Sequence, residues 1–245
     1  MAKKPRTPDP PRRVQAPKQR HAARQLPAVD RTRMILYGAA ALGVVALIVV
    51  LAVVLAGGSS GSAGNVANIA ATMRAAGCTI SATKAAPVAG HSTSFGQTLT
   101  YSTYPPVSGR HYYLPAIWGD YSQVVDPRQA VHNEEHGGIV VWVGPDVSAA
   151  VRRQISDFYD ESPNAMLVTP IENSADGVKY PKHAPPDAKI FLTAWATKTP
   201  GDYADAQAVI ASCPRFQEKA FTAFRDEFRG KGPERFPVDS LKPGT

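Results

Sequence analysis

The chain has 245 residues, of which 44% are hydrophobic and 19% are charged, so it holds enough apolar material for one ordinary core beside a membrane segment. The formal net charge of +7 is concentrated at one end, because ten Lys and Arg residues, against two Asp, lie in residues 1–33. The remainder is close to neutral, which argues against a nucleic-acid-binding domain and leaves no nucleic acid among the expected partners.

Residues 1–33 are predicted to form a disordered, basic, cytoplasmic tail. Six prolines stand among many charges there, and such a segment cannot bury enough apolar surface to fold. Its basic side chains are expected to contact anionic lipid headgroups, at about 1 kcal/mol for each one near the surface. Recruitment of a cytoplasmic protein by the tail is an alternative that no motif supports.

The segment of residues 34–56, which begins at Met34 and ends at Ala56, is predicted to be a single transmembrane helix. It contains no charge, and about 20 apolar residues span the hydrocarbon core of a bilayer. Basic residues precede it, so we expect a single-pass protein of the cell membrane, with the N-terminus in the cytoplasm and the C-terminal part outside. A cleaved signal peptide is the alternative, although its apolar region is usually shorter. The Gly/Ser-rich residues 57–64 are a linker, and residues 65–245 form the extracytoplasmic domain.

The chain contains two cysteines, Cys78 and Cys213, and both lie in the part assigned to the oxidising side of the membrane. We expect a disulfide between them, and two inert buried thiols are the alternative. On the chain-entropy model such a long closed loop stabilises the fold by about 4–5 kcal/mol.

The hydrophobic pattern predicts an alternation of helices and strands in residues 65–245. A short helix is expected before Gly77, and the region of residues 91–121 is typical of short strands and turns because of its Pro, Gly, Ser and Tyr content. Further along, we predict strands at 138–143, 165–171 and 189–196, helices at 148–161 and within 202–229, with a break at Cys213-Pro214, and an irregular tail after Gly230. The expected fold is α+β: a small mixed β-sheet with flanking helices that cover one face, preceded by one transmembrane helix.

Two short segments hold three of the six histidines. The first ends in Pro-Pro-Val-Ser-Gly-Arg-His111, and the second, residues 131–137, reads Val-His-Asn-Glu-Glu-His-Gly. A capping Asp126, a proline at the first helical position and Gly137 as a stop predict a helix over residues 127–136, which places His132, Glu135 and His136 on one face. An extended segment would instead place Glu134 between the two histidines. Either geometry gives two imidazoles flanking a carboxylate.

Imidazole nitrogen and carboxylate oxygen are ligands suited to zinc, copper or non-haem iron. We therefore predict a metal site made of His111, His132, Glu135 and His136, with His91 as a further candidate and copper or zinc as the ion. The alternative is a hydrogen-bonded polar turn that fixes the start of the following strand.

The segment from His132 to His136 also fits the inverted zinc-peptidase pattern His-x-x-Glu-His, in which Glu135 would act as general base. That arrangement needs a longer helix and a third ligand, and the sequence identifies neither. Three hypotheses follow: a metal-binding domain without catalysis as the first choice, a metal-dependent envelope hydrolase, and a non-enzymatic envelope scaffold.

These residues resemble a bacterial family of membrane-anchored or secreted proteins, domain of unknown function 3105. The resemblance spans roughly residues 70–236, and its motifs are His91, Pro-Pro-Val-Ser-Gly-Arg-His at 105–111, Gly119 with Tyr121, Val-His-Asn-Glu-Glu-His-Gly-Gly at 131–138 and, more weakly, 192–195 and 232–234. It implies an extracytoplasmic domain with a histidine-rich centre and no particular reaction. In this family the residue before the second glutamate is often apolar, which implies that Glu135 is the functional carboxylate and Glu134 an exposed substitution.

Overall fold

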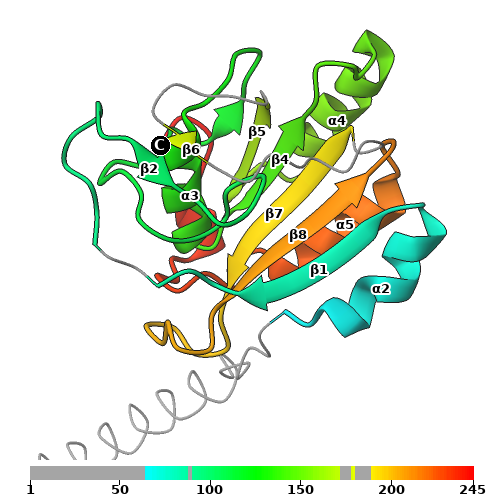
Figure 1. Ribbon diagram of the computed structural model, residues 1–245. Helices are drawn as coiled ribbons and strands as arrows, with labels where there is room; N and C mark the ends of the chain where they lie inside the picture. Colours follow the sequence, from blue (N-terminus) through cyan, green and yellow to red (C-terminus); the bar gives the residue numbers. More distant parts are fainter. Residues whose placement is uncertain (1–63, 88–89, 172–177, 180–188) are drawn as a thin grey trace, which may run out of the picture. The chain divides into compact units, whose positions relative to one another are not determined.

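In the computed structural model, the described residues are 64–87, 90–171, 178–179 and 189–245 (Figure 1). The predicted tail, the predicted transmembrane segment of residues 34–56 and the linker up to residue 63 lie outside them. Among the described residues no helix is long and apolar enough to cross a bilayer.

A six-stranded mixed sheet forms the centre of the domain, which confirms the predicted α+β class. The strand order is β1-β8-β7-β4-β5-β3, in which β1, β8, β7 and β4 pair antiparallel and β4, β5 and β3 pair parallel. The strands are β1 (Thr79–Lys84), β3 (Gly119–Asp120), β4 (Ile139–Val143), β5 (Met166–Pro170), β7 (Ile190–Ala196) and β8 (Gln207–Cys213). Two short strands, β2 (Leu99–Thr100) and β6 (Val178–Lys179), pair separately in parallel.

The central strand β4 consists of buried β-branched residues and one tryptophan, a composition that favours a strand covered on both faces. Its alternate residues belong to different cores. Val141 packs with the three long helices, whereas Trp142 packs with the loops and short helix of the opposite face. The sheet is therefore buried on both sides.

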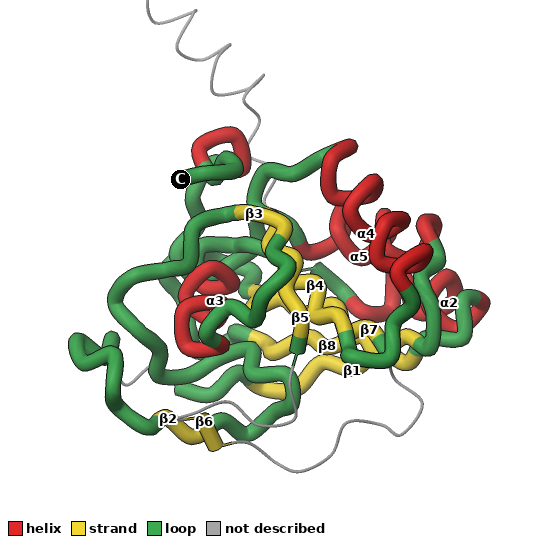
Figure 2. Tube along the Cα trace, turned by 90° about the horizontal axis from the view of Figure 1, so that it is seen from above, coloured by secondary structure: helices red, strands yellow, loops and turns green. Residues whose placement is uncertain are grey.

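Three helices cover one face: α2 (Val66–Ala75), α4 (Ala149–Glu161) and α5 (Glu218–Phe228). Figure 2 shows them together on one side of the strands. The Ser148 hydroxyl caps α4 by accepting a hydrogen bond from the Val151 backbone nitrogen, and Gly77, before which a helix was expected, follows α2 with a positive φ of 77°.

The fourth helix, α3 (Pro127–Glu135), lies on the opposite face with the loops of residues 101–118. The expectation that helices cover only one face is therefore wrong. The reason is that α3 has apolar residues, including Ala130 and Val131, that pack under the sheet beside its polar ones. Its ends are as predicted: Asp126 accepts from the Arg128 backbone, and Gly137 has φ 93°.

The predicted helical region of residues 202–229 is wrong in its first half. Residues Gln207–Cys213 form β8, which pairs with both β1 and β7 near the middle of the sheet. The remaining half is helical, as α5, and the irregular tail contains one short 3-10 turn, η1 (Val238–Ser240). Strand β1 was not predicted because it is an edge strand with mostly exposed side chains, so its sequence lacks the alternation of a half-buried strand.

Cys78 and Cys213 form a disulfide with an S–S distance of 2.05 Å, as predicted. Cys78 directly precedes β1 and Cys213 ends its antiparallel neighbour β8, so the bond closes a loop between residues 135 apart in sequence at one end of this strand pair.

Candidate metal centre

Within helix α3, Asn133 anchors the helix to a neighbouring loop, and His132 and Glu135 belong to the candidate site. The side-chain amide of Asn133 donates to the Ala116 carbonyl at 2.8 Å, and its oxygen accepts from the Ala116 backbone nitrogen at 2.9 Å. This fully buried pair of hydrogen bonds holds the preceding loop against the helix. His132 and Glu135 then point into the space between helix and loop.

The loop histidines reach the same place through backbone contacts. The Ser92 nitrogen donates to the His111 carbonyl at 2.7 Å, and the Tyr113 nitrogen donates to the Ser92 carbonyl at 3.1 Å. These bonds hold the segment that carries His91 beside the one that carries His111. Two histidines 20 residues apart in sequence thereby become neighbours.

Four of the five predicted ligands form one group, which we call the inner group: His91, His111, His132 and Glu135. One ligand atom from each lies within 4.8 Å of all the others. Oε2 of Glu135 is 3.0 Å from Nε2 of His111 and 3.4 Å from Nε2 of His91. The structure thus brings these four residues together, including the candidate His91.

The backbone determines which ring nitrogens can bind a cation. Nδ1 of His111 lies 2.8 Å from the Gly109 carbonyl oxygen, and Nδ1 of His132 lies 2.7 Å from that of Tyr112. A carbonyl oxygen only accepts, so each Nδ1 carries the proton and donates it. In the neutral rings Nε2 therefore presents a lone pair to the inner group, which is the usual arrangement of a metal-binding histidine.

This arrangement brings two acceptors into contact. Nε2 of His111 and Oε2 of Glu135 are both buried, lie 3.0 Å apart and have no hydrogen-bond partner among the other described residues. Burying two lone pairs against each other is unfavourable unless a cation neutralises them. The donor set therefore fits a metal ion, and a proton on Nε2 of His111 is the alternative cation.

Burial controls the charge of the groups involved. Burial, reinforced by the neighbouring His136, lowers the pKa of His132 to about 4, and burial likewise lowers the pKa of His136. Burial alone would raise the pKa of Glu135, but the contact with His111 and the hydrogen bond from Tyr203 outweigh it, so this pKa lies below its usual value. At neutral pH His132 and His136 are thus neutral and Glu135 is a carboxylate, the forms that bind metals.

Tyr203 is a site residue that the sequence did not indicate. Its hydroxyl donates to Oε1 of Glu135 at 2.9 Å from the segment before β8. Since Oε1 is engaged by Tyr203, Oε2 is the oxygen left to face the histidines. Tyr203 therefore orients the carboxylate.

His136 belongs to a second set, which we call the outer group: His132, His136 and Glu234. Nε2 of His136 is 3.0 Å from Nε2 of His132 and 3.4 Å from Oε2 of Glu234, and its ring packs on Phe236. Glu234 was not a predicted ligand, although residues 232–234 are a weak motif of the family resemblance. The two groups share a single residue, His132.

Glu134 is not the exposed substitution that was expected. It is fully buried, and burial raises the pKa of its carboxyl well above the usual value. Burial therefore favours the protonated, neutral form of this carboxyl. The expectation failed because the sheet and the loops together cover the side of α3 that carries Glu134.

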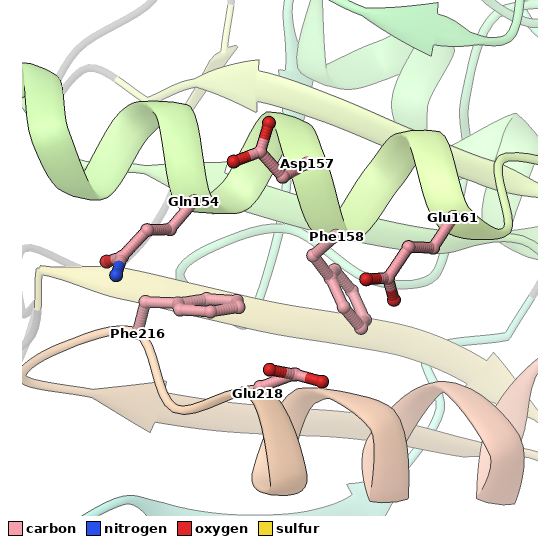
Figure 3. A pocket seen from close by; sticks show the side chains of 6 residues that line it. All are labelled: Gln154, Asp157, Phe158, Glu161, Phe216 and Glu218. Atoms are coloured by element: carbon pink, nitrogen blue, oxygen red, sulfur yellow. The ribbon is translucent and has the colours of Figure 1, made fainter.

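A separate hollow lies on the helical face of the sheet, opposite α3. It has a volume of about 150 Å³, and Figure 3 shows three carboxylates and two phenylalanine rings around it. The lining residues are Gln154, Asp157, Phe158, Glu161, Phe216 and Glu218. In the described part of the chain, the sets of three or more side chains able to hold a metal are the inner and outer groups, and this hollow contributes none.

Comparison with known proteins gives one match. The model of a family described as protein of unknown function (DUF3105) matches residues 92–222, more than half of the chain. The matched region includes His111, His132, Glu135 and His136, whereas His91 and Glu234 lie outside it. No curated protein and no solved structure matches.

Proposed function

Since the chain belongs to the DUF3105 family, whose description assigns no activity, we propose a function from the site itself: the domain binds one copper or zinc ion through the inner group. The observation that carries this proposal is the buried contact between Nε2 of His111 and Oε2 of Glu135, for which the described residues supply no hydrogen-bond partner. A bound cation would satisfy both atoms together with the lone pair of His132.

The choice of ion follows from the donors. Three imidazole nitrogens and one carboxylate oxygen form a four-donor set without a thiolate. Such donors favour zinc or copper(II) over magnesium or calcium, which prefer oxygen ligands. Copper(II) and zinc are thus the ions to test first.

The test measures metal in the full-length chain, purified from a culture supplemented with copper and zinc, by mass spectrometry. We expect close to one equivalent of one ion, and loss of most of it in His111→Asn and in Glu135→Gln. His183→Asn, at a histidine outside both groups and outside the described residues, is the matched control and should retain the metal. A wild-type content below about one-tenth of an equivalent would contradict the proposal, since sites of this kind hold ions near stoichiometrically.

We also propose that the domain is held at the outer surface of the membrane by residues 34–56. The uncharged apolar segment and the basic residues before it support this placement. The disulfide supports it too, because disulfides form and persist in oxidising compartments. In a fractionated cell the full-length chain should stay with membranes after alkaline carbonate extraction, and a variant lacking residues 34–56 should not. Equal release of both chains would contradict the anchor.

A metal-dependent envelope hydrolase is the second candidate, and one observation favours it. Glu234 supplies, beside His132 and His136, the third ligand that the inverted zinc-peptidase pattern requires. Glu135 would then be the general base on metal-bound water. The variant Glu135→Gln distinguishes the two candidate functions. If the protein is the hydrolase, this variant keeps its metal and loses turnover of a peptide substrate. If the inner group binds the ion, the variant loses the metal.

A further inference from the structure

We infer that the outer group is a second metal site, which first captures the copper or zinc ion and then passes it to the inner group through His132. This inference rests on the proposed function of the inner group. In the transfer, the ion forms bonds to Nε2 of His111 and to the Glu135 carboxylate as its bonds to His136 and Glu234 break. His132 stays bound throughout, and no electron changes place.

The shared atom makes the two sites alternatives. Nδ1 of His132 donates its proton to the Tyr112 carbonyl at 2.7 Å, so the neutral ring has one lone pair, on Nε2. Since both groups include His132, this lone pair is the one that the residue can offer to either of them. It binds one ion at a time, and the chain should therefore saturate at one ion, although it offers two ligand sets.

The expected direction of transfer follows from the solvent exposure of the ligand side chains. The side chains of Glu234 and His136 are 41% and 15% exposed, whereas those of His111 and Glu135 are 0% and 1% exposed, and the remaining inner ligand, His91, is 36% exposed but carries no carboxylate. A hydrated cation is attracted first to Glu234, the exposed carboxylate, whereas the buried ligands His111 and Glu135 are reached only after water has been removed from the ion. Moving inward by exchange of single ligands avoids losing the whole hydration shell in one step.

The outer carboxylate is also held in place by the fold. The segment of residues 230–234 crosses the end of α3, where the Gly230 nitrogen donates to the Gly137 carbonyl at 2.8 Å and the Glu234 nitrogen donates to the Glu135 carbonyl at 2.9 Å. Glu234 is thus fixed by its backbone next to the helix end that presents His136. Its side chain, which is partly exposed, has room to follow the ion.

The test compares rates of loading with copper(II) in the chelator-treated, full-length chain. The Trp195 ring lies 6.1 Å from the His111 ring, so stopped-flow quenching of tryptophan fluorescence reports the binding of copper(II) by the two adjoining groups. Glu234→Gln should slow loading by about tenfold or more, since the carboxylate that concentrates the cation is lost. It should slow release by the same factor and leave the equilibrium affinity and the final content of one ion unchanged.

Two further variants complete the experiment. Glu161→Gln, at an exposed carboxylate of α4, is the matched control and should load as the wild type does. His111→Asn keeps the outer group but not the inner one, so it should still bind copper(II) rapidly and lose it on desalting.

The outcomes separate this inference from the proposed function. A wild-type chain that keeps no copper after desalting contradicts the inner site and therefore both. Retention of one ion with a wild-type loading rate in Glu234→Gln contradicts only the transfer. Two ions held at once would also contradict the transfer. A Glu234→Gln variant whose affinity falls while its release rate rises would contradict it too, because Glu234 would then belong to the final site or support it.

Discussion

Two carbonyl oxygens, those of Gly109 and Tyr112, decide which atoms of the site can bind a cation. By accepting the Nδ1 protons of His111 and His132, they turn both Nε2 lone pairs inward. Tyr203 acts on the carboxylate in the same way by engaging Oε1 of Glu135. The ligands are therefore oriented before any ion arrives, which lowers the ordering cost of binding.

This orientation predicts the effect of Tyr203→Phe. The ring stays and the donor to Oε1 is lost, so the affinity for zinc should fall by about 10- to 100-fold, the usual effect of removing such a partner. A competition titration with a fluorescent chelator measures it. Tyr113→Phe, at a 43% exposed residue, is the control and should be neutral. An unchanged affinity in Tyr203→Phe would show that the carboxylate needs no such support.

Glu134 predicts a pH dependence of stability. Its pKa is raised in the folded chain, so its contribution to stability is fully present below the unfolded pKa of about 4.3 and is lost as pH rises through the folded pKa. Glu134→Gln is neutral at every pH. Relative to this variant, the wild-type free energy of unfolding should therefore fall by up to about 1.4 kcal/mol per pH unit above about pH 5, because one proton is involved.

Urea denaturation of both chains from about pH 5 to about pH 8, with a chelator to remove metal effects, measures this difference. All other groups are common to the two chains, so the difference isolates Glu134. Parallel pH profiles would mean that the buried carboxyl titrates normally in the folded state.

At the residue scale, the sequence identified the ligand types but not all their partners. His111, His132 and Glu135 stood out because they occur in short motifs, and the caps predicted a helix over residues 127–136, of which Pro127–Glu135 is helical. Tyr203 and Glu234 could not be found in this way, because they reach the site from distant parts of the chain, Tyr203 from 68 residues beyond Glu135. Only the weak motif at residues 232–234 pointed toward Glu234.

At the scale of elements, the junction between α3 and the segment of residues 230–234 is the critical contact. A Cβ on Gly232 would clash with the Gly137 nitrogen and the Glu135 carbonyl oxygen, both of which are backbone atoms. Only glycine allows this approach. The close contact is what brings Glu234 beside His136.

Gly232→Ala should therefore destabilise the fold by about 1–3 kcal/mol through overpacking and displace Glu234 from the outer group. Urea denaturation measures the first effect, and slower copper(II) loading reports the second. Gly96→Ala is the matched control, because a Cβ there meets nothing within 4 Å. Equal stability of the two variants would contradict the close approach.

The errors in predicting elements have a common physical origin. The alanine-containing residues 207–213 have no strong strand pattern, and it is pairing with β1 and β7 that makes them a strand. By contrast β4 and α4 were predicted well, because the apolar run of β4 and the cap of α4 are features of the local sequence. Local patterns thus predict the elements that stabilise themselves, and tertiary contacts decide the others.

At the scale of the whole molecule, the disulfide is the strongest single constraint. Replacing both Cys78 and Cys213 with Ala should lower the free energy of unfolding by about 4–5 kcal/mol, as the chain-entropy model gives for a loop of this length. Urea denaturation measures the loss, and wild-type chain treated with a reductant should show a similar one. A loss below about 1 kcal/mol would mean that the unfolded chain is already restricted there.

The inner group draws its side chains from three separate stretches of the chain, and the outer group adds a fourth near the C-terminus. Such a site exists only when the whole domain is folded, so an ion that binds it favours the folded state, by about 2.7 kcal/mol at a concentration one hundred times the dissociation constant. Proteases remove unfolded chains. If a metal binds as proposed, the amount of folded protein in the cell should therefore rise and fall with the supply of that metal.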